Sequence, residues 1–281
     1  MHAVVVAYNA ADHLDRCLAA LKLQVPVTVI DNSSSAEVAA VTAAHGVSYI
    51  DSGANRGFAG GVNLGLSLLA CDPGDVLLVN PDAVLRSNAA RALAEFLSRP
   101  ENARVAAVSP RILLTGNVEQ RVMWPFPSPL RMWAQAFGIW RWPARRTFAI
   151  GAVLLLRREA IKDVGTFDER FFLYAEETDW QRRACQRDWR STLCVDAVAE
   201  HVGAASSTDN RRQEVLHEAG QETYIRKWHG PIGWAGYRAA AFLSAAGLAV
   251  ILPSRRRRRL AARRALLYLR GPKRVAARQG R

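Results

Sequence analysis

The chain has 281 residues, a formal net charge of +13 at neutral pH, and a hydrophobic content of 50%. This composition supplies a sizeable core and argues against global disorder, and the length fits one large domain or one domain with an appendage. The four cysteines are scattered and form no CxxC pair, which argues against a structural zinc site or a disulfide framework.

Apolar strands alternate with helices through the first hundred residues. We expect buried strands at residues 3–8, 27–30, 47–50, 76–79 and 105–108. Between them we expect helices at residues 11–23, 36–45 and 89–98. This alternation predicts an α/β fold with a mostly parallel sheet flanked by helices. Polar residues gather where the strands end, which is where open α/β sheets bind ligands.

The stretch 115–147 interrupts this rhythm, because it holds four of the eight tryptophans and four prolines. We expect it to be a loop-rich insertion. Regular patterns resume afterwards, with a strand at 149–156 and helices near 158–164 and 176–187.

The tripeptide Asn80-Pro81-Asp82 directly follows a buried strand. A carboxylate at that position could hold a divalent metal against a diphosphate, since Mg²⁺ and Mn²⁺ prefer oxygen ligands. The alternative is a simple turn, for which Asn-Pro-Asp is also well suited. His201, beyond the strand-like 191–195, could be a second metal ligand or an ordinary polar residue whose hydrogen bonds are satisfied by the protein.

A glycine-rich segment, 55–63, leads into an apolar helix. Glycines let backbone N–H groups approach phosphate oxygens, and a helix N-terminus favours negative charge. The segment is neither GxGxxG nor a P-loop. It could equally be a tight loop that packs a helix on the sheet.

Three carboxylates, Glu176, Glu177 and Asp179, follow an aromatic run at 171–174. Apolar surroundings and neighbouring like charges raise a carboxyl pKa toward values useful for a general base. The other interpretation is a helix N-terminus, where acidic residues oppose the dipole and Asp179 pairs with Arg183 at i,i+4. Both interpretations can hold together.

Taken in order, these motifs resemble glycosyltransferase family 2 enzymes of the GT-A fold, in particular the rhamnosyltransferase-like branch. The resemblance covers about residues 3–230. It is carried by residues 4–9, 31–34, 55–63, 80–82, 151–152, 164–172 and 176–179.

The resemblance implies a site for a nucleotide-diphosphate sugar, with Asp31 near the base and Mg²⁺ or Mn²⁺ at Asp82 and His201. The family's usual first aspartate is here Asn80, which leaves Asp82 as the direct ligand. The donor nucleotide would lie against Ala7, Tyr8, Asn9, Asp31, Asn55, Gly57, Gly60, Asn63 and Asn80.

The resemblance also implies a single displacement that inverts the anomeric carbon. The family's Glu-Asp pair, whose second member is typically the base, appears here as Glu176-Glu177. The base is therefore Glu177 or Glu176, with Asp179 as the next candidate. Only one base is required, whereas a glycosidase would need two carboxyls flanking the bond.

The positive charge is concentrated at the C-terminal end. Twelve Lys or Arg and no acidic residue lie within 253–281, so the rest of the chain is close to neutral, and we expect these cations to lack local neutralisation. The apolar stretch 239–252 is shorter than the ~20 residues that span a bilayer. Together with 255–259 it resembles an interfacial anchor on an anionic membrane surface. The alternative is a helix packed on the catalytic domain, followed by a disordered basic tail.

We therefore expect a catalytic domain at 1–230 and a membrane-associating helical, basic tail at 231–281, peripheral on the cytoplasmic face of the plasma membrane. The donor of first choice is dTDP-rhamnose, with UDP-galactofuranose second. The acceptor is a polyprenyl-diphosphate-linked saccharide in cell-wall or surface-polysaccharide assembly. A catalytically inactive relative that binds sugar nucleotides is the alternative. The missing GxGxxG argues against a dehydrogenase, and the neutral body argues against a nucleic-acid-binding protein.

Overall fold

The computed structural model describes residues 1–139, 145–201 and 210–279. Its contacts divide the chain into two compact units, which are described separately. The first comprises Met1–Pro125, Arg146–Phe172 and Glu176–Thr208. The second comprises Phe126–Arg145, Leu173–Ala175 and Asp209–Arg281. The contacts thus group residues 209–230 with the C-terminal helices, whereas the sequence placed the division at residue 230.

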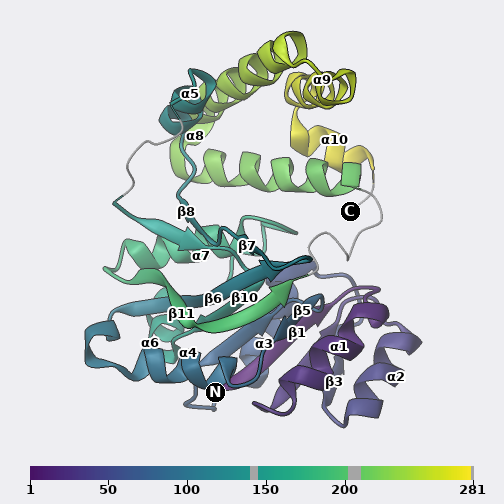
Figure 1. Ribbon diagram of the computed structural model, residues 1–281, viewed down its shortest axis with the longest axis vertical. Coiled ribbons are helices and arrows are strands. Elements are labelled where there is room, and N and C mark those ends of the chain that lie inside the picture. Colours follow the sequence, from purple (N-terminus) through teal and green to yellow (C-terminus); the bar gives the residue numbers. More distant parts are fainter. Residues whose placement is uncertain (140–144, 202–209, 280–281) are drawn as a thin grey trace. The chain divides into compact units, whose positions relative to one another are not determined.

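The first unit is built on a nine-stranded sheet in the order β3-β2-β1-β4-β10-β6-β11-β5, with β7 paired to β6 (Figure 1). Its strands are β1 His2–Ala7, β2 Val27–Asp31, β3 Ser48–Asp51, β4 Val76–Val79, β5 Ala83–Leu85, β6 Val105–Leu114, β7 Val118–Gln120, β10 Val153–Leu156 and β11 Arg190–His201. Two further short strands, β8 Met123–Pro125 and β9 Thr147–Ala149, pair with each other.

The sheet is mixed. Strands β3, β2, β1 and β4 are parallel, as expected for strands joined by crossover helices. Strand β10 is antiparallel to both of its neighbours, β4 and β6. It enters from the 115–147 segment rather than over a crossover helix, so nothing imposes the parallel direction on it. The parallel half brings the carboxyl ends of β1, β2 and β4 to one edge, because Ala7 lies opposite Asp31 and Val5 lies opposite Val79.

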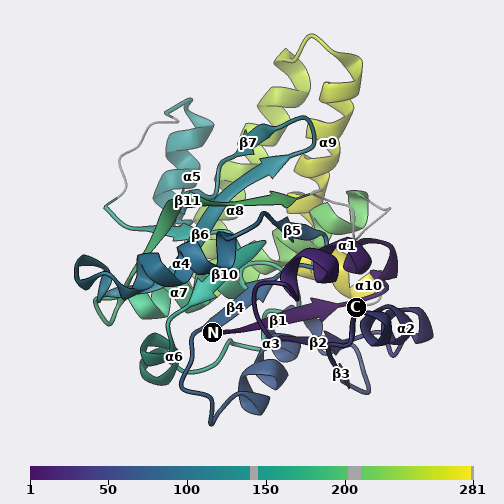
Figure 2. The same cartoon turned by 60° about the horizontal axis from the view of Figure 1, so that its bottom comes forward.

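Helices cover both faces of the sheet (Figures 1 and 2). Side chains of β1 alternate between two apolar clusters, with Ala3 and Val5 in one and Val4 and Val6 in the other. The first cluster includes residues of α1 Ala11–Leu21, α2 Ala36–His45 and α4 Ala89–Ser98, and a 3₁₀ turn follows at Pro100–Asn102. The second includes residues of α3 Gly57–Leu68, α6 Arg158–Val164 and α7 Glu176–Cys185. The expected α/β fold is therefore confirmed, but the strand expected at 149–156 is two strands, because Ala149 at the end of β9 pairs with Met123 whereas Val153 at the start of β10 pairs with Val79 of the main sheet.

The second unit is helical and contains α5 Pro129–Ala136, α8 Asn210–Ile251, α9 Arg255–Arg270 and α10 Pro272–Arg278. The expectation of a loop-rich 115–147 segment was wrong where α5 and the strands β7 to β9 lie. Ser128 explains α5, because its hydroxyl accepts a hydrogen bond from the Arg131 N–H, and Pro129 occupies the first helical turn. Residues 140–144 lie outside the described part of the chain.

Helix α8 is two helices joined at a kink. Gly230 has a φ of 67°, outside the helical region, and Pro231 follows it. Glycine tolerates this conformation, so the first helix ends there. Proline lacks a backbone N–H, but the first N–H of a helix has no partner within the helix, so Pro231 can begin the second helix. The apolar stretch at 239–252 is thus almost wholly the end of α8, not a separate element. By length and composition, Arg211–Ile251 could cross a membrane, with a mean hydropathy of 1.3 in its apolar window.

Helix α9 packs along α8 through buried polar bonds. The carboxylate of Glu218 is bonded to Arg264, at 2.6 Å, and to the hydroxyl of Tyr268. Our expectation that the cations of the tail lack local neutralisation was therefore wrong for Arg264, because its partner lies 46 residues away in α8. The tail is also helical as far as residue 278, so the alternative of a disordered basic tail does not hold for that part.

Candidate functional site

The ends of β1 and β2 form a shared polar rim in the first unit. The Asn32 N–H donates to the carbonyl of Ala7 at 2.8 Å, and the Asn9 N–H donates to the Ser33 hydroxyl at 3.1 Å. Asn9 has a φ of 47°, which turns the chain away from the sheet just after Tyr8, whose side chain is 46% exposed. The predicted donor residues Ala7, Tyr8 and Asn9 thus lie beside the end of β2.

Asp31 is fully buried, and both of its carboxylate oxygens have protein partners. Oδ1 accepts from the Ser33 N–H at 2.8 Å, and Oδ2 accepts from the Ser35 N–H at 2.8 Å and the Tyr49 hydroxyl at 3.0 Å. These bonds fix the turn that carries Asn32 to Ser35. In this structure Asp31 shapes the rim, and direct contact with the nucleoside base stays a prediction.

The glycine-rich segment begins helix α3 against the 166–172 loop. The Asn55 side chain accepts from the Gly57 N–H at 3.0 Å, and the Phe58 N–H donates to the Phe172 carbonyl at 2.8 Å. Gly57 has a φ of 69°, and a Cβ placed there would lie 2.2 Å from the Phe172 carbonyl oxygen. Only glycine fits this close approach. The motif at 164–172 therefore supports the glycine-rich segment directly.

Two further positions of that segment are small for packing reasons. A Cβ at Gly60 would lie 2.7 Å from the Arg56 Cβ, and one at Gly61 would lie 2.6 Å from Val6 on β1. Asn63 uses its amide to hold the 166–172 loop: it donates to the Phe167 carbonyl at 2.9 Å and accepts from the Phe167 N–H at 2.8 Å. The tight-loop interpretation of this segment is thus seen in the structure, and its contact with nucleotide stays a prediction.

Asn32 is a polar residue that the sequence analysis did not assign to the site. It is buried, and its Nδ2 donates to the Gly57 carbonyl at 2.8 Å, while its Oδ1 has no hydrogen-bond partner among the described residues. It therefore links the rim to the start of α3 and leaves an acceptor unused. Its place directly after a buried strand and before three serines was the available signal.

The candidate metal ligands lie together beyond the carboxyl end of β4. Oδ1 of Asp82 is 3.4 Å from Nε2 of His201, and both side chains are shielded from solvent. They meet because His201, at the end of β11, lies opposite Ala83 on β5. Among residues 1–139, 145–201 and 210–279 there is no group of three or more His, Cys, Asp or Glu side chains that could hold a metal.

Gln120 on β7 orients the imidazole, a role that sequence reasoning missed. Its Oε1 lies 3.2 Å from Nδ1 of His201. With the amide so assigned, Nδ1 donates to Gln120, which leaves Nε2 facing Asp82, either with a proton that pairs with the carboxylate or with a lone pair for a shared cation. A lone pair facing a carboxylate is favourable when a cation is shared between them. No pattern in the sequence signals Gln120, because the pairing of β7 with β6 brings it there.

The carboxylate cluster starts helix α7. Glu176 is buried, and its Oε2 has no hydrogen-bond partner among the described residues. Burial, followed by the negative charge of Glu177, raises the pKa of the Glu176 carboxyl well above its usual range. Asp179 is fully buried and pairs with Arg183 at 3.0 Å, so the expected i,i+4 pair is confirmed. Asp179 thereby holds α7 rather than facing solvent.

Glu177 is half-buried and lies close to the turn that precedes β10. A Cβ at Gly151 would be 3.4 Å from the Glu177 Cγ. The next residue, Ala152, accepts at 2.9 Å from the Asn80 N–H. One short segment therefore separates the carboxylate pair from the Asn80-Pro81-Asp82 motif. Gln181 fixes α7 on the end of β9, by donating to the Ala149 carbonyl at 2.7 Å and accepting from its N–H at 2.8 Å.

Comparison with known proteins relates this arrangement to sugar transfer. A family model described as glycosyl transferase family 2 matches residues 3–165. An N-acetylglucosaminyl-diphospho-decaprenol L-rhamnosyltransferase of Mycobacterium tuberculosis is 29% identical, over 92% of this chain and 95% of its own length. The low-salt glycan biosynthesis hexosyltransferase Agl10 of Haloferax volcanii is 27% identical, over 69% of this chain and 65% of its own.

Solved structures share the fold. Glucosyl-3-phosphoglycerate synthase of Mycobacterium tuberculosis, in complex with Mn²⁺, UDP and phosphoglyceric acid, matches with a TM-score of 0.55 and 12% identity, over 82% of this chain and 78% of that one. The same enzyme with Mn²⁺ and UDP-glucose matches with a TM-score of 0.51 and 12% identity, over 80% and 78%. At this identity the likeness shows the GT-A fold alone.

Proposed function

The chain belongs to glycosyl transferase family 2, and on that premise we propose that it moves a sugar from a nucleotide-diphosphate donor to an acceptor hydroxyl with inversion. The observation that carries the proposal is the short link Asn80-Ala152-Gly151-Glu177. It puts a candidate general base next to the strand end where a diphosphate would lie. A base and a diphosphate site at one sheet edge are what a single displacement needs.

The proposed base is Glu177. Glu176 is buried and its Oε2 has no hydrogen-bond partner among the described residues, so the protein encloses this carboxyl and it is poorly placed to take a proton from an acceptor. Glu177 is half-buried, so part of its side chain is open to solvent, from which an acceptor would approach. In the proposed reaction, Glu177 takes the proton of the acceptor hydroxyl while that oxygen attacks the anomeric carbon from the face opposite the leaving nucleotide diphosphate.

The proposed metal ligands are Asp82 and His201. Their donor set, one carboxylate and one imidazole whose Nε2 lies 3.4 Å from it, fits a divalent cation that takes its other ligands from diphosphate and water. Gln120 would hold the imidazole in the binding tautomer. A bound Mg²⁺ or Mn²⁺ would neutralise charge on the departing diphosphate. The rim formed by Ala7, Asn9 and Asn32 would position the nucleotide.

For the substrates we propose dTDP-rhamnose as donor and a polyprenyl-diphosphate-linked saccharide as acceptor, in cell-wall or surface-polysaccharide assembly. The relative named as an N-acetylglucosaminyl-diphospho-decaprenol L-rhamnosyltransferase supports both choices, because the similarity spans 92% of this chain. Another donor, such as UDP-galactofuranose, is the second candidate. We also propose a peripheral position on an anionic membrane surface, at its cytoplasmic face, and the apolar end of α8 with the exposed arginines at the start of α9 supports the association with a membrane.

A donor panel tests this function. Purified full-length protein is given dTDP-rhamnose, UDP-galactofuranose or other sugar nucleotides, together with a lipid-linked acceptor and Mg²⁺, and release of nucleotide diphosphate is measured. Acceptor-dependent release from dTDP-rhamnose supports the first choice. Release from a different donor corrects the sugar and keeps the reaction. If no donor is consumed although sugar nucleotides bind, the chain is an inactive relative.

A further inference from the structure

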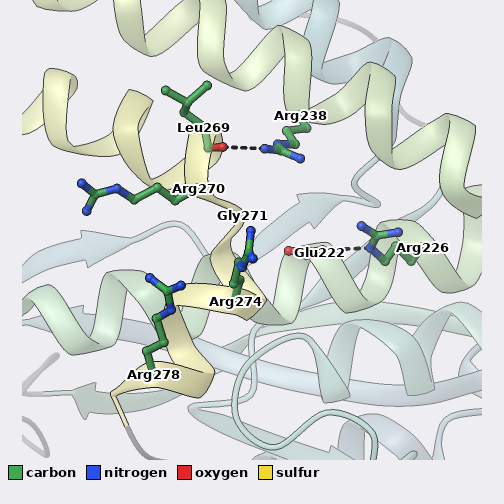
Figure 3. Close-up of a pocket in the computed structure, with 8 residues that line it drawn as sticks. All are labelled: Glu222, Arg226, Arg238, Leu269, Arg270, Gly271, Arg274 and Arg278. Atoms are coloured by element: carbon green, nitrogen blue, oxygen red, sulfur yellow. Dashed lines mark hydrogen bonds and ion pairs between the residues drawn. The ribbon is translucent and has the colours of Figure 1, made fainter.

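A cavity of about 650 Å³ lies in the second unit, among the helices α8, α9 and α10 (Figure 3). None of the residues assigned to the proposed transfer reaction lines it. Five of its eight lining residues are arginines: Arg226, Arg238, Arg270, Arg274 and Arg278. The other three are Glu222, Leu269 and Gly271. The cavity is therefore strongly basic.

The fold of the C-terminal helices builds this arginine cluster. Gly271, with a φ of 86°, turns the chain between α9 and α10. Arg274 and Arg278 are four residues apart on α10 and so share one face of it. From α8, Arg238 donates through Nε to the Tyr268 carbonyl and through a terminal nitrogen to the Leu269 carbonyl, both at 2.6 Å. These bonds fix the last turn of α9 against α8.

The positive charge of the cavity is not balanced by its walls. The one carboxylate, Glu222, is already bonded to Arg226 at 2.8 Å and to the Lys273 N–H at 3.1 Å. The guanidinium groups of Arg270, Arg274 and Arg278 have no hydrogen-bond or ion-pair partner within residues 1–139, 145–201 and 210–279. Guanidinium groups that gather without counter-charges repel one another, and a bound anion removes that repulsion.

We propose that this cavity binds a phosphate or diphosphate group. The planar guanidinium fork matches phosphate oxygens and can bond to two of them at once. A volume of about 650 Å³ is in the range of small-molecule sites, so a diphosphate with part of its substituent fits. The diphosphate of a lipid-linked acceptor supplies this group, a source that rests on the proposed function. The headgroup phosphate of a bilayer phospholipid has the same chemistry.

Calorimetric titration of the full-length protein with inorganic pyrophosphate tests the site. EDTA is present throughout, so that metal-dependent diphosphate binding at Asp82 does not contribute. Two double variants carry the same charge change at the same i,i+4 spacing: Arg274→Gln with Arg278→Gln in the cavity, and Arg255→Gln with Arg259→Gln on the exposed start of α9. We expect affinity to fall about tenfold or more in the first and to stay within about twofold in the second.

Equal weakening in both double variants would show a general charge effect and overturn the proposal, as would failure of the wild-type protein to bind pyrophosphate. Phosphatidylcholine vesicles doped with a polyprenyl diphosphate or with phosphatidylglycerol, at equal surface charge, identify the source. If the cavity variant loses binding only to the vesicles with polyprenyl diphosphate, the lipid-linked diphosphate is the source. If it loses binding equally to both kinds of vesicle, the phospholipid headgroup is the source. If the cavity variant binds both kinds of vesicle as well as the wild-type protein does, a lipid source is overturned. None of these measurements needs donor or turnover, so they succeed or fail separately from the proposed function.

Discussion

A Cβ at Gly151 would lie 3.4 Å from the Cγ of Glu177, so the backbone before β10 passes directly beside this carboxylate. We expect Glu177→Gln to lower turnover by about 10²–10⁴, the usual contribution of one general base, with donor affinity largely kept. Turnover is measured as nucleotide-diphosphate release and affinity by calorimetry. The matched variant is Glu176→Gln. If it shows the larger loss in turnover, the two roles must be exchanged.

Glu176 gives a prediction about stability and pH. Its pKa is raised in the folded state, so its contribution to stability is complete below the unfolded pKa of about 4.5 and is lost as pH rises toward the folded pKa. Glu176→Gln removes this pH-dependent loss of stability, because a glutamine amide does not ionise. The free energy of unfolding of the variant should therefore improve relative to wild type as pH rises from about 4 to 8, as measured by urea titration. A difference that does not change with pH would contradict the raised pKa.

Metal dependence follows from Asp82 and His201. We expect EDTA to abolish activity and Mg²⁺ or Mn²⁺ to restore it, and Asp82→Ala to remove metal-dependent donor binding measured by calorimetry. Gln120→Ala should be milder and weaken metal affinity about 10–100-fold, because Gln120 acts only through its contact with Nδ1 of His201. Full activity in chelator would refute the metal assignment.

The close approach of Gly57 to the Phe172 carbonyl can be separated from backbone strain. Gly57 and Gly53 have nearly equal φ values, 69° and 70°, but a Cβ at Gly53 would meet nothing within 4 Å. We expect Gly53→Ala to lower the free energy of unfolding by about 1–2 kcal/mol, the cost of a left-handed alanine. Gly57→Ala should cost about 1–3 kcal/mol more and weaken donor binding, because the Phe172 segment must move. Equal losses of unfolding free energy in the two variants would mean that the 166–172 loop moves at little cost.

Local patterns made the sheet and the carboxylate cluster predictable. The apolar runs of β1, β2 and β4 identified buried strands, and the spacing of Asp179 and Arg183 identified their ion pair. Contacts that depend on tertiary structure were not accessible in this way. Gln120 reaches His201 because β7 pairs with β6 and β6 in turn pairs with β11.

The C-terminal helices show the same limit. Charge counting treated the tail as unneutralised, yet Arg264 bonds to Glu218 across 46 positions. Burial alone would raise the pKa of Glu218, but His217, 3.8 Å away, and Arg264, 2.6 Å away, lower it to about 2. Such a pair appears only when α9 folds back along α8 (Figure 2). Similarly, the prolines near α5 indicated a loop in the sequence, although Pro129 in fact begins a helix.

Membrane binding should have an electrostatic and an apolar part, and the end of α8 supplies the second. Val250 and Ile251 are 75% and 74% exposed, next to the exposed arginines that start α9. Salt screens the arginines but not the burial of hydrocarbon, so high salt should remove only part of the protein bound to anionic vesicles.

Val250→Ser with Ile251→Ser should abolish that salt-resistant part, because burying each side chain contributes about 1.5–3 kcal/mol. The control is Leu23→Ser with Leu68→Ser, which removes two exposed apolar side chains from the first unit. Binding is measured by vesicle sedimentation at low and high salt, with circular dichroism to verify folding. If the Val250 and Ile251 variant keeps its salt-resistant binding, or if the control loses as much, the end of α8 does not enter the membrane interface.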